Sequence, residues 1–237
     1  MNINMNMTIE ITTKNKINKD IDFDDIFITW LPNQEKEDII KKVEEVFLLG
    51  KNPIPHIPAK RIKSRKQAYY LSNELSKYCR KVLLIGGSGI PTGVYSKVSQ
   101  IIDTNAFDNF EIGVAGFPEG NGKLTYDQSM EILKSKDYAD FVVTQWSLSK
   151  KSIKRFLDDS PLPVYLGIPN KCSIKKLMKF AKLCGIQNSI RGILANPINI
   201  IRFMVGFNPK YLINKYKDHE KLENFHIYSF GNLKKII

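Results

Sequence analysis

The fold of this chain is best indicated by residues 82–86, which read VLLIG and carry no polar side chain. A strand covered on one face alternates apolar and polar residues, whereas a parallel strand covered on both faces is continuously apolar. We therefore predict a buried parallel strand here. Seven other short apolar runs predict further strands, at residues 8–12, 25–30, 54–59, 111–116, 141–145, 163–168 and 225–230.

Amphipathic stretches lie between most of these runs. Residues 35–49 have an apolar stripe at helical spacing. A second helix should begin at Ser64, where Ser64 and Gln67 form a capping-box pattern, and a third near Ser173. The residues expected to face inward from the first helix are Ile39, Ile40, Val43, Val46 and Phe47.

The alternation of strands and helices predicts the fold class. Parallel strands need crossover connections, so the pattern indicates an α/β protein with a parallel sheet. Eight strands favour closure into a (β/α)8 TIM barrel, with an open doubly wound sheet as the alternative. Residues 13–24 are polar and short, which predicts a shortened first βα unit. We expect one domain over residues 1–237, with residues 1–7 as a flexible N-terminus.

The chain is basic, with a formal net charge of +12, and should therefore favour anionic partners. Its lysines are spread over nearly the whole sequence, as expected for solvated helix faces. The densest cluster, residues 60–66, is short and interrupted. Because no block of five or six consecutive basic residues occurs, we do not expect a nucleic-acid partner.

The cysteines and histidines point to neither disulfides nor metal. Cys79, Cys172 and Cys184 are odd in number and form no CxxC motif, and the three histidines lack the spacing of metal ligands. Residues 1–7 have no apolar core of signal-peptide length, and no run reaches the roughly 18 to 20 apolar residues of a membrane span. These features predict a cytoplasmic protein with reduced thiols.

Polar residues at the ends of the predicted strands are the candidates for a site, because barrel active sites lie at the C-terminal strand ends. Glu10 is the most informative of them. A carboxylate inside an apolar strand is costly to bury, and burial raises its pKa, which suits a general acid. Alternatively, Glu10 is exposed or pairs with a lysine.

Residues at three other strand ends each have a ligand-binding and a purely structural interpretation. Residues 86–93, GGSGIPTG, could let a ligand approach the backbone or simply form a tight turn, and they match neither a Walker A loop nor a GxGxxG motif. His56 could bind a ligand or be a hydrogen-bonded core imidazole. The amide of Gln145 needs partners, which a ligand or a neighbouring strand end would supply.

Seven segments together resemble the methylenetetrahydrofolate reductase family, in the order in which that family has them. They are residues 8–11 (TIEI), 55–61 (PHIPAKR), 84–93 (LIGGSGIPTG), 113–121 (GVAGFPEGN), 139–145 (ADFVVTQ), 166–169 (LGIP) and 225–230 (FHIYSF). The resemblance covers about residues 8–232 and agrees with the barrel inferred from the strand count.

This resemblance implies reduction of 5,10-methylenetetrahydrofolate to 5-methyltetrahydrofolate with hydride from NADH or NADPH, passed through FAD or transferred directly. Glu10 would be the general acid. The residues implied to bind the folate substrate are Gln145, Ser88, Thr144 and Glu119. The residues implied to line the flavin are Thr29, His56, Gly87, Ser88, Tyr95, Phe117, Asn121 and Lys136.

Two departures from the family pattern support an alternative. Ser88 stands where the family has an aspartate, and a hydroxyl cannot replace that charge; Asn121 stands where the family has a histidine. The alternative is a non-redox barrel that binds folate, or transfers its methyl group with a partner protein. In either case the positive charge would help attract a polyglutamylated folate. The chain could also form a homo-oligomer or act with a methyltransferase partner.

Overall fold

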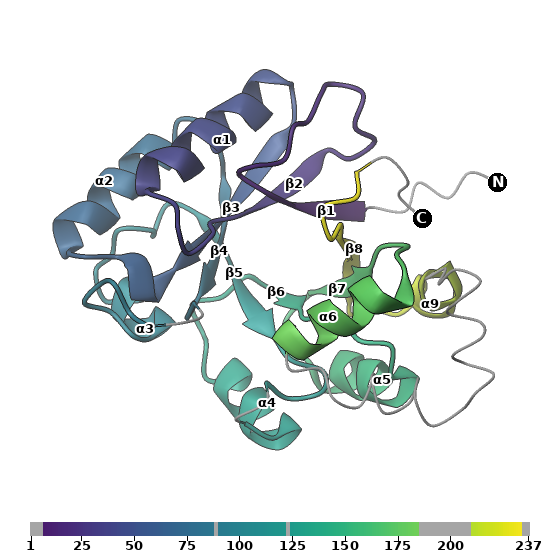
Figure 1. Cartoon of the computed structure of the whole chain (residues 1–237). Coiled ribbons are helices and arrows are strands. Elements are labelled where there is room, and N and C mark those ends of the chain that lie inside the picture. Colours follow the sequence, from purple (N-terminus) through teal and green to yellow (C-terminus); the bar gives the residue numbers. More distant parts are fainter. Residues whose placement is uncertain (1–6, 88–89, 122–123, 185–209, 234–237) are drawn as a thin grey trace. The chain divides into compact units, whose positions relative to one another are not determined.

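The computed structural model describes residues 7–87, 90–121, 124–184 and 210–233 (Figure 1). Eight strands are ordered β1-β2-β3-β4-β5-β6-β7-β8 in a closed barrel, and the registered neighbours run parallel. The strands are β1 (Met7–Thr12), β2 (Asp25–Thr29), β3 (Asn52–Pro58), β4 (Lys81–Ile85), β5 (Glu111–Gly116), β6 (Phe141–Thr144), β7 (Val164–Pro169) and β8 (Leu222–Tyr228). The predicted (β/α)8 barrel is confirmed, and closure excludes the open doubly wound sheet.

Helices follow most of the strands along the chain. They are α1 (Lys36–Leu48), the short η1 (Ala59–Arg61), α2 (Arg65–Leu75), α3 (Val98–Ile102), α4 (Tyr126–Lys134), α5 (Lys150–Asp159), α6 (Ile174–Cys184) and α9 (Lys210–Tyr216). All eight predicted strands are present. The largest boundary error is at β8, which begins three residues earlier than expected, at Leu222.

The chain divides into two compact units by its contacts. The amino-terminal unit comprises residues 8–115 and 138–141, and the carboxy-terminal unit comprises residues 1–7, 116–137 and 142–237. Of residues 1–7, which were expected to be flexible, Met7 begins β1, and residues 1–6 lie outside the described residues.

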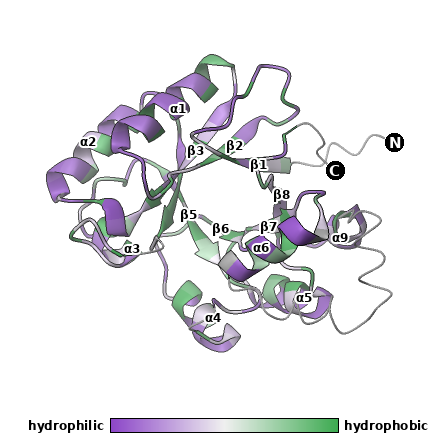
Figure 2. Ribbon diagram, viewed as in Figure 1, coloured by the Kyte–Doolittle hydropathy of each residue, from purple (hydrophilic) through white to green (hydrophobic). Residues whose placement is uncertain are grey.

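In the amino-terminal unit, α1 was predicted correctly in extent but not in every inward residue. Its buried apolar residues are Ile39, Val43 and Val46. Phe47 was expected to face inward, and this is wrong: it is 45% exposed and packs its ring against Tyr78, with ring centroids 5.6 Å apart. Phe47 follows Val46 by one residue, a turn of about 100° that carries it off the buried stripe. Figure 2 shows that α1 is largely hydrophilic outside this stripe.

The shortened first βα unit is confirmed, because residues 13–24 form no helix. The segment is instead held by polar contacts. Asn15 accepts hydrogen bonds from the backbone and hydroxyl of Thr12, and its carbonyl accepts one from the buried ammonium of Lys42 at 2.7 Å. Lys42 also pairs with Glu45, so its burial is compensated.

Helix α2 begins as its sequence predicts. The Ser64 hydroxyl accepts a hydrogen bond from the backbone N–H of Gln67 at 3.1 Å. The reciprocal half of the expected capping box is displaced by one residue, because the Gln67 side chain accepts from the backbone of Lys63 rather than from Ser64. The Ser64 hydroxyl still satisfies one backbone N–H of the first turn, that of Gln67.

In the carboxy-terminal unit, β7 pairs with both β6 and β8. Gly167 allows this close approach, because a Cβ atom there would overlap the carbonyl oxygen of Thr144 and lie 2.8 Å from the nitrogen of Trp146. Trp146, Leu177 and Ala181 form a buried cluster that fixes α6 against the loop after β6. Helix α9 precedes β8, the last strand of the barrel.

None of the helices in the described part of the chain is both long enough and apolar enough to cross a membrane.

Gly113 tests the packing of the amino-terminal unit. A Cβ atom at Gly113 would overlap the ring of Phe141, which is only 2% exposed and cannot move freely. Gly113→Ala should therefore lower the free energy of unfolding by about 1–3 kcal/mol, as overpacked cores do, measured by urea denaturation. Gly86→Ala is the matched control, since nothing lies within 4 Å of an added Cβ there. Equal stability of the two variants would contradict the packing described.

Candidate functional site

Glu10 lies on β1 between two buried isoleucines. Side chains alternate along a strand, so Glu10 projects from the face opposite to Ile9 and Ile11. In the register of the sheet Glu10 pairs with Phe27 of β2, and Phe27 pairs with Ile54 of β3. His56 follows Ile54 by two residues and therefore projects from the same face of β3 as Ile54. The strand pattern thus accounts for the approach of Glu10 to His56.

The carboxylate of Glu10 and the imidazole of His56 form the first part of the candidate site. Glu10 Oε2 lies 3.8 Å from His56 Nε2. The His56 side chain is 7% exposed and the Glu10 side chain 24%, so the carboxylate is the more accessible group. The ring of Phe27 meets the imidazole edge to face, with centroids 6.0 Å apart. Of the alternatives for Glu10, the structure shows partial exposure, with a histidine beside the carboxylate.

Such a pair can move a proton. An imidazole and a carboxylate each exchange protons readily, and general acids are most effective when they meet the reacting atom at hydrogen-bond distance. Glu10 is open to a ligand, whereas His56 is enclosed behind it. Glu10 is therefore the group of this pair that would contact a ligand.

Thr29 ends β2 in the same unit and has an unsatisfied group. Its hydroxyl oxygen is buried and makes no hydrogen bond to any residue that the structure describes. Buried polar groups normally have partners, so an orphaned hydroxyl at a strand end fits a ligand atom.

The loop after β4 is tied to the loop after β3. The backbone N–H groups of Thr92 and Gly93 both donate to the carbonyl of Lys60, at 2.9 and 2.8 Å. Gly87 has φ +85°, a conformation that favours glycine, and a Cβ there would lie 3.0 Å from Pro58. Tyr95 is half-buried in this loop, and Ser88 lies outside the described residues. The tight-turn interpretation of the glycines is supported at Gly87.

The carboxy-terminal unit supplies a second carboxylate. Glu119, in the loop after β5, accepts a hydrogen bond of 2.5 Å from the hydroxyl of Ser147, in the loop after β6. Ser147 is fully buried, and its oxygen also accepts from the backbone of Ser149 at 3.0 Å. Ser147 therefore links the end of β5, through Glu119, to the cap of α5. Sequence analysis missed Ser147, although its place two residues after Gln145 at a strand end was a usable signal.

Gln145 lies directly after β6 and is half-buried. Its backbone N–H donates to the carbonyl of Gly116 at 2.8 Å, which joins the ends of β6 and β5. The side-chain carbonyl accepts from the backbone of Trp146 at 3.1 Å, while the amide nitrogen makes no hydrogen bond within the described ranges. The amide nitrogen is therefore a donor available to a ligand.

Thr144 has a role in the barrel wall. It is fully buried, and its hydroxyl accepts a hydrogen bond of 2.8 Å from the backbone N–H of Gly167 on β7. Its carbonyl accepts from the hydroxyl of Tyr228 at 3.0 Å. These contacts hold Thr144 in the barrel wall, and its substrate-binding role stays a prediction.

The other predicted residues of this unit lie in the loop after β5 and in the connection between α4 and β6. Phe117 is half-buried after β5, and Asn121 accepts a hydrogen bond from the backbone of Leu124, which closes the loop. Lys136 lies between α4 and β6, on the connection that leads to the N-terminal end of β6, whereas Gln145 follows its C-terminal end. Burial lowers the pKa of Lys136 below its ordinary value.

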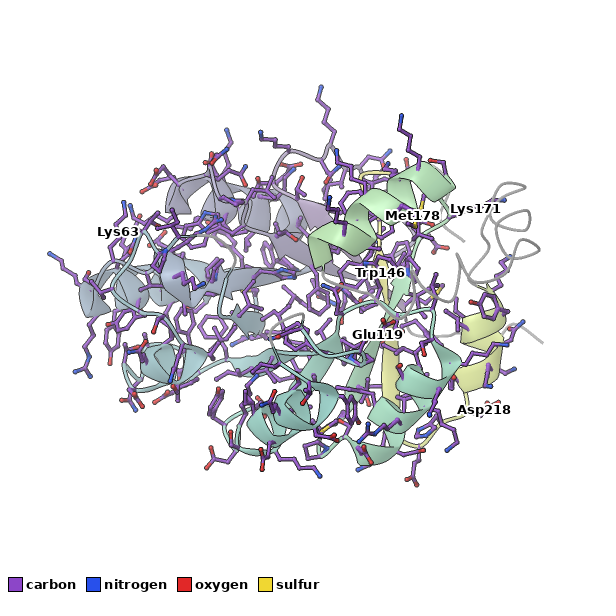
Figure 3. All side chains as sticks on the ribbon, turned by 60° about the horizontal axis from the view of Figure 1, so that its bottom comes forward. Lys63, Glu119, Trp146, Lys171, Met178 and Asp218 are labelled. Carbon is purple, nitrogen blue, oxygen red and sulfur yellow. The ribbon has the colours of Figure 1, made fainter. Side chains whose placement is uncertain are left out.

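Aromatic side chains gather near α6 in the same unit. Phe180 stacks on Phe230 with centroids 4.4 Å apart, and Trp146 meets Phe230 edge to face at 5.8 Å. Figure 3 shows Trp146 beside α6. The indole nitrogen of Trp146 is buried and finds no acceptor among the residues described. His226 and Tyr228, two residues apart on β8 with rings 4.9 Å between centroids, were also missed, although their spacing marks one face of the strand.

Metal and thiol chemistry find no support in the described ranges. No group of three or more His, Cys, Asp or Glu side chains there could hold a metal ion. Burial raises the pKa of the Cys79 thiol to about 12 and that of Cys172 to about 11, so both are protonated at neutral pH.

Comparison with known proteins identifies the fold. No family model matches the chain. One similar solved structure is an uncharacterized protein from Clostridium thermocellum that binds two copies of 5-methyl-5,6,7,8-tetrahydrofolic acid; it has a TM-score of 0.63 and 15% identity, over 94% of this chain and 87% of that chain. Oxaloacetate acetylhydrolase has a TM-score of 0.55 and 12% identity, over 70% of this chain and 67% of that chain. At these identities the likeness shows the fold alone.

Ser147 tests the link between the loops after β5 and β6. Ser147→Ala removes the hydroxyl that donates to Glu119 and accepts from Ser149. The free energy of unfolding should fall by about 1–3 kcal/mol, because a hydrogen bond to a charged group is lost in a buried position. Ser135→Ala, at an exposed serine that donates to a helix carbonyl, is the control and should have little effect. Equal free energies of unfolding for the two variants would show that Ser147 does not stabilise the link between these loops.

Proposed function

We propose that this barrel binds a reduced folate and reduces 5,10-methylenetetrahydrofolate to 5-methyltetrahydrofolate, with hydride from NADH or NADPH. Three facts support this. The chain resembles the methylenetetrahydrofolate reductase family in seven ordered segments, its fold is similar to that of a protein that binds 5-methyltetrahydrofolate, and Glu10 lies beside a buried histidine. The proposed reaction rests chiefly on the Glu10–His56 pair.

Glu10 is the proposed general acid. Its proton goes to N10 of the folate, the bond between N10 and the bridging carbon breaks, and the N5 iminium that results accepts hydride at that carbon to become the methyl group. The nicotinamide is oxidised and the folate is reduced. The partial exposure of Glu10 allows this contact, and the imidazole of His56 lies 3.8 Å from the carboxylate.

Gln145 and Glu119 are the proposed polar contacts for the pterin. A pterin has amino and ring N–H donors and a carbonyl acceptor. The amide nitrogen of Gln145 would donate to such an acceptor, and the carboxylate of Glu119, fixed by Ser147, would accept from donors. The position of the pterin matters more than its binding affinity, because hydride transfer depends on the orientation of donor and acceptor.

A flavin would fit the residues at the ends of β2, β3 and β4. The buried hydroxyl of Thr29 lacks a hydrogen-bond partner among the described residues. Gly87 has no side chain, so a ligand can approach the backbone of its loop. When bound, FAD would relay hydride from NADH or NADPH to the folate. Thr29 would then hydrogen-bond it, and Tyr95 would cover it from the loop after β4. Direct transfer from the nicotinamide needs no such relay.

A second candidate is a non-redox barrel that binds 5-methyltetrahydrofolate or passes its methyl group to a partner protein. Ser88 in place of the family's aspartate favours this candidate, as does the methylated ligand named for the Clostridium thermocellum protein. Wild-type protein that binds 5-methyltetrahydrofolate yet never oxidises NADH or NADPH with methylenetetrahydrofolate, with or without added FAD, would select it.

Glu10→Gln tests the reductase proposal. The amide keeps the shape of the side chain but has no acidic proton, so turnover should fall by about 10²–10⁴-fold, the usual contribution of a general acid. The Kd for 5-methyltetrahydrofolate should change little, since that ligand needs no proton. NADH or NADPH oxidation and calorimetric titration measure the two quantities.

The control is Glu111→Gln, at an exposed glutamate that begins β5 and pairs with Lys81. It removes the same charge from the N-terminal end of a strand and should leave turnover unchanged. Unchanged turnover in Glu10→Gln would exclude Glu10 as the acid.

A further inference from the structure

The basic cluster of residues 60–66 follows the C-terminal end of β3 and leads into the start of α2. It contains five cationic side chains and no acidic one. Because the run is short and interrupted, its sequence alone is not a reason to expect a nucleic-acid partner. In the structure, however, the cluster lies beside exposed aromatic rings that are not part of the run.

Most of these cations have no acidic partner. Four of the five make no ion pair with any residue that the structure describes, namely Arg61, Lys63, Arg65 and Lys66. Every aspartate and glutamate of the chain falls within the described ranges, so no other acidic side chain is left to pair with them. The carboxylate of Glu37 feels the charge of Lys63, but its side-chain hydrogen bond is to Lys36. The cluster therefore keeps an excess of positive charge.

The outward face of α2 adds two aromatic rings to this charge. The helix is buried through Ala68, Leu71, Ser72 and Leu75. Arg65 and Lys66 therefore turn to the solvent together with Tyr69 and Tyr70, which follow them at the three- and four-residue spacing of neighbours on a helix. Tyr69 is 38% exposed and Tyr70 is 45% exposed. Two large rings are thus open to a ligand.

Each of these exposed rings is paired with a cation. The guanidinium carbon of Arg65 lies 5.8 Å from the ring centroid of Tyr69. The ammonium of Lys36, on the neighbouring helix α1, lies 5.5 Å from the ring centroid of Tyr70 (Figure 1). Contacts of this kind hold a cation near an aromatic face without neutralising its charge. Cations and rings therefore alternate on one surface of the amino-terminal unit.

Arg61 is held in place in the segment that leads to this face. Its guanidinium carbon lies 5.6 Å from the ring centroid of Trp30, and the group donates a hydrogen bond to the carbonyl of Leu31. Burial lowers the pKa of Arg61, although an arginine stays charged at neutral pH. A guanidinium has five N–H donors in a planar fork that matches a phosphate group. Most of these donors are left for a ligand.

This combination suits a single-stranded nucleic acid. Proteins that bind single strands use cations for the phosphates and exposed aromatic rings on which unpaired bases stack. A duplex keeps its base faces inside the helix, so the rings of Tyr69 and Tyr70 would have no partner there. An anionic membrane would favour aliphatic side chains beside the cations. The outward face of α2 carries none, because its other exposed residue in these turns is Asn73.

We call Arg61, Lys63, Arg65, Lys66, Tyr69 and Tyr70 the α2 surface; Figure 3 labels Lys63. We infer that the α2 surface binds single-stranded nucleic acid, RNA or DNA, through its four cations and its two rings. This inference does not rest on the proposed folate chemistry, because none of these six residues is a proposed folate contact. About four phosphate contacts predict that the logarithm of the binding constant falls with the logarithm of salt concentration with a slope of about −3.

The test measures fluorescence anisotropy of labelled oligouridylate and oligodeoxythymidylate of about twelve nucleotides, within the usual range of site sizes, with the full chain at several salt concentrations. Wild type should bind at least one of the two with the slope given above, and the tighter strand identifies the ligand as RNA or DNA. The triple variant Lys63→Gln, Arg65→Gln, Lys66→Gln should bind more weakly and reduce the slope by about 2. The double variant Tyr69→Leu, Tyr70→Leu should weaken binding by about tenfold or more, because stacked bases are lost.

The matched control replaces Lys134, Lys175 and Lys179, exposed lysines of the carboxy-terminal unit, with glutamine. It removes the same charge and should bind the strands as wild type does. The inference is overturned if wild type binds neither strand at low salt, or if the control weakens binding as much as the triple variant. It is also overturned if the tyrosine variant binds as wild type does, or if phosphatidylserine vesicles displace the strand equally well, which would make the surface a membrane site.

Discussion

Backbone pairing is the constraint on which this structure depends. Every N–H and C=O of a buried parallel strand needs a neighbour, and the closed order β1 to β8 gives each strand two. Parallel strands in such a barrel present their C-terminal ends in common, so side chains far apart in sequence are carried to strand ends by the register alone. In the amino-terminal unit that register brings Glu10 to His56, and in the carboxy-terminal unit the loops after β5 and β6 bring Glu119 to Ser147.

The two carboxylates have different partners, and this difference suits different roles. Glu119 receives a 2.5 Å hydrogen bond from a buried serine, which fixes its orientation as an acceptor. Glu10 faces an imidazole at 3.8 Å, longer than a hydrogen bond, and keeps part of its surface open. A fixed acceptor suits recognition of a ligand, whereas an accessible carboxyl group beside a proton-exchanging ring suits proton transfer.

The sequence predicted the strands well because burial on both faces leaves an unmistakable run of apolar residues. It predicted the start of α2 because capping is local, and Ser64 and Gln67 are only three residues apart. It was wrong about Phe47, since an aromatic residue at the edge of a helical stripe can pack on a neighbouring ring instead of the core.

The candidate site was predictable in its positions but not in its contacts. Strand ends identified Glu10, His56, Glu119 and Gln145, yet the bond between Glu119 and Ser147 joins residues 28 apart and has no local signature. Thr144 illustrates the reverse case, because a polar residue at a strand end proved to be bonded to the neighbouring strand.

The most direct test of the folate site uses the three histidines of the chain as probes. Imidazole signals of His56, His219 and His226 can be followed by NMR while 5-methyltetrahydrofolate is added. A ligand in contact with Glu10 should shift the His56 signals to a saturating limit, because His56 Nε2 lies 3.8 Å from the Glu10 carboxylate. His56 signals that remain unchanged when folate has saturated the protein, or a protein that takes up no folate, would contradict the account.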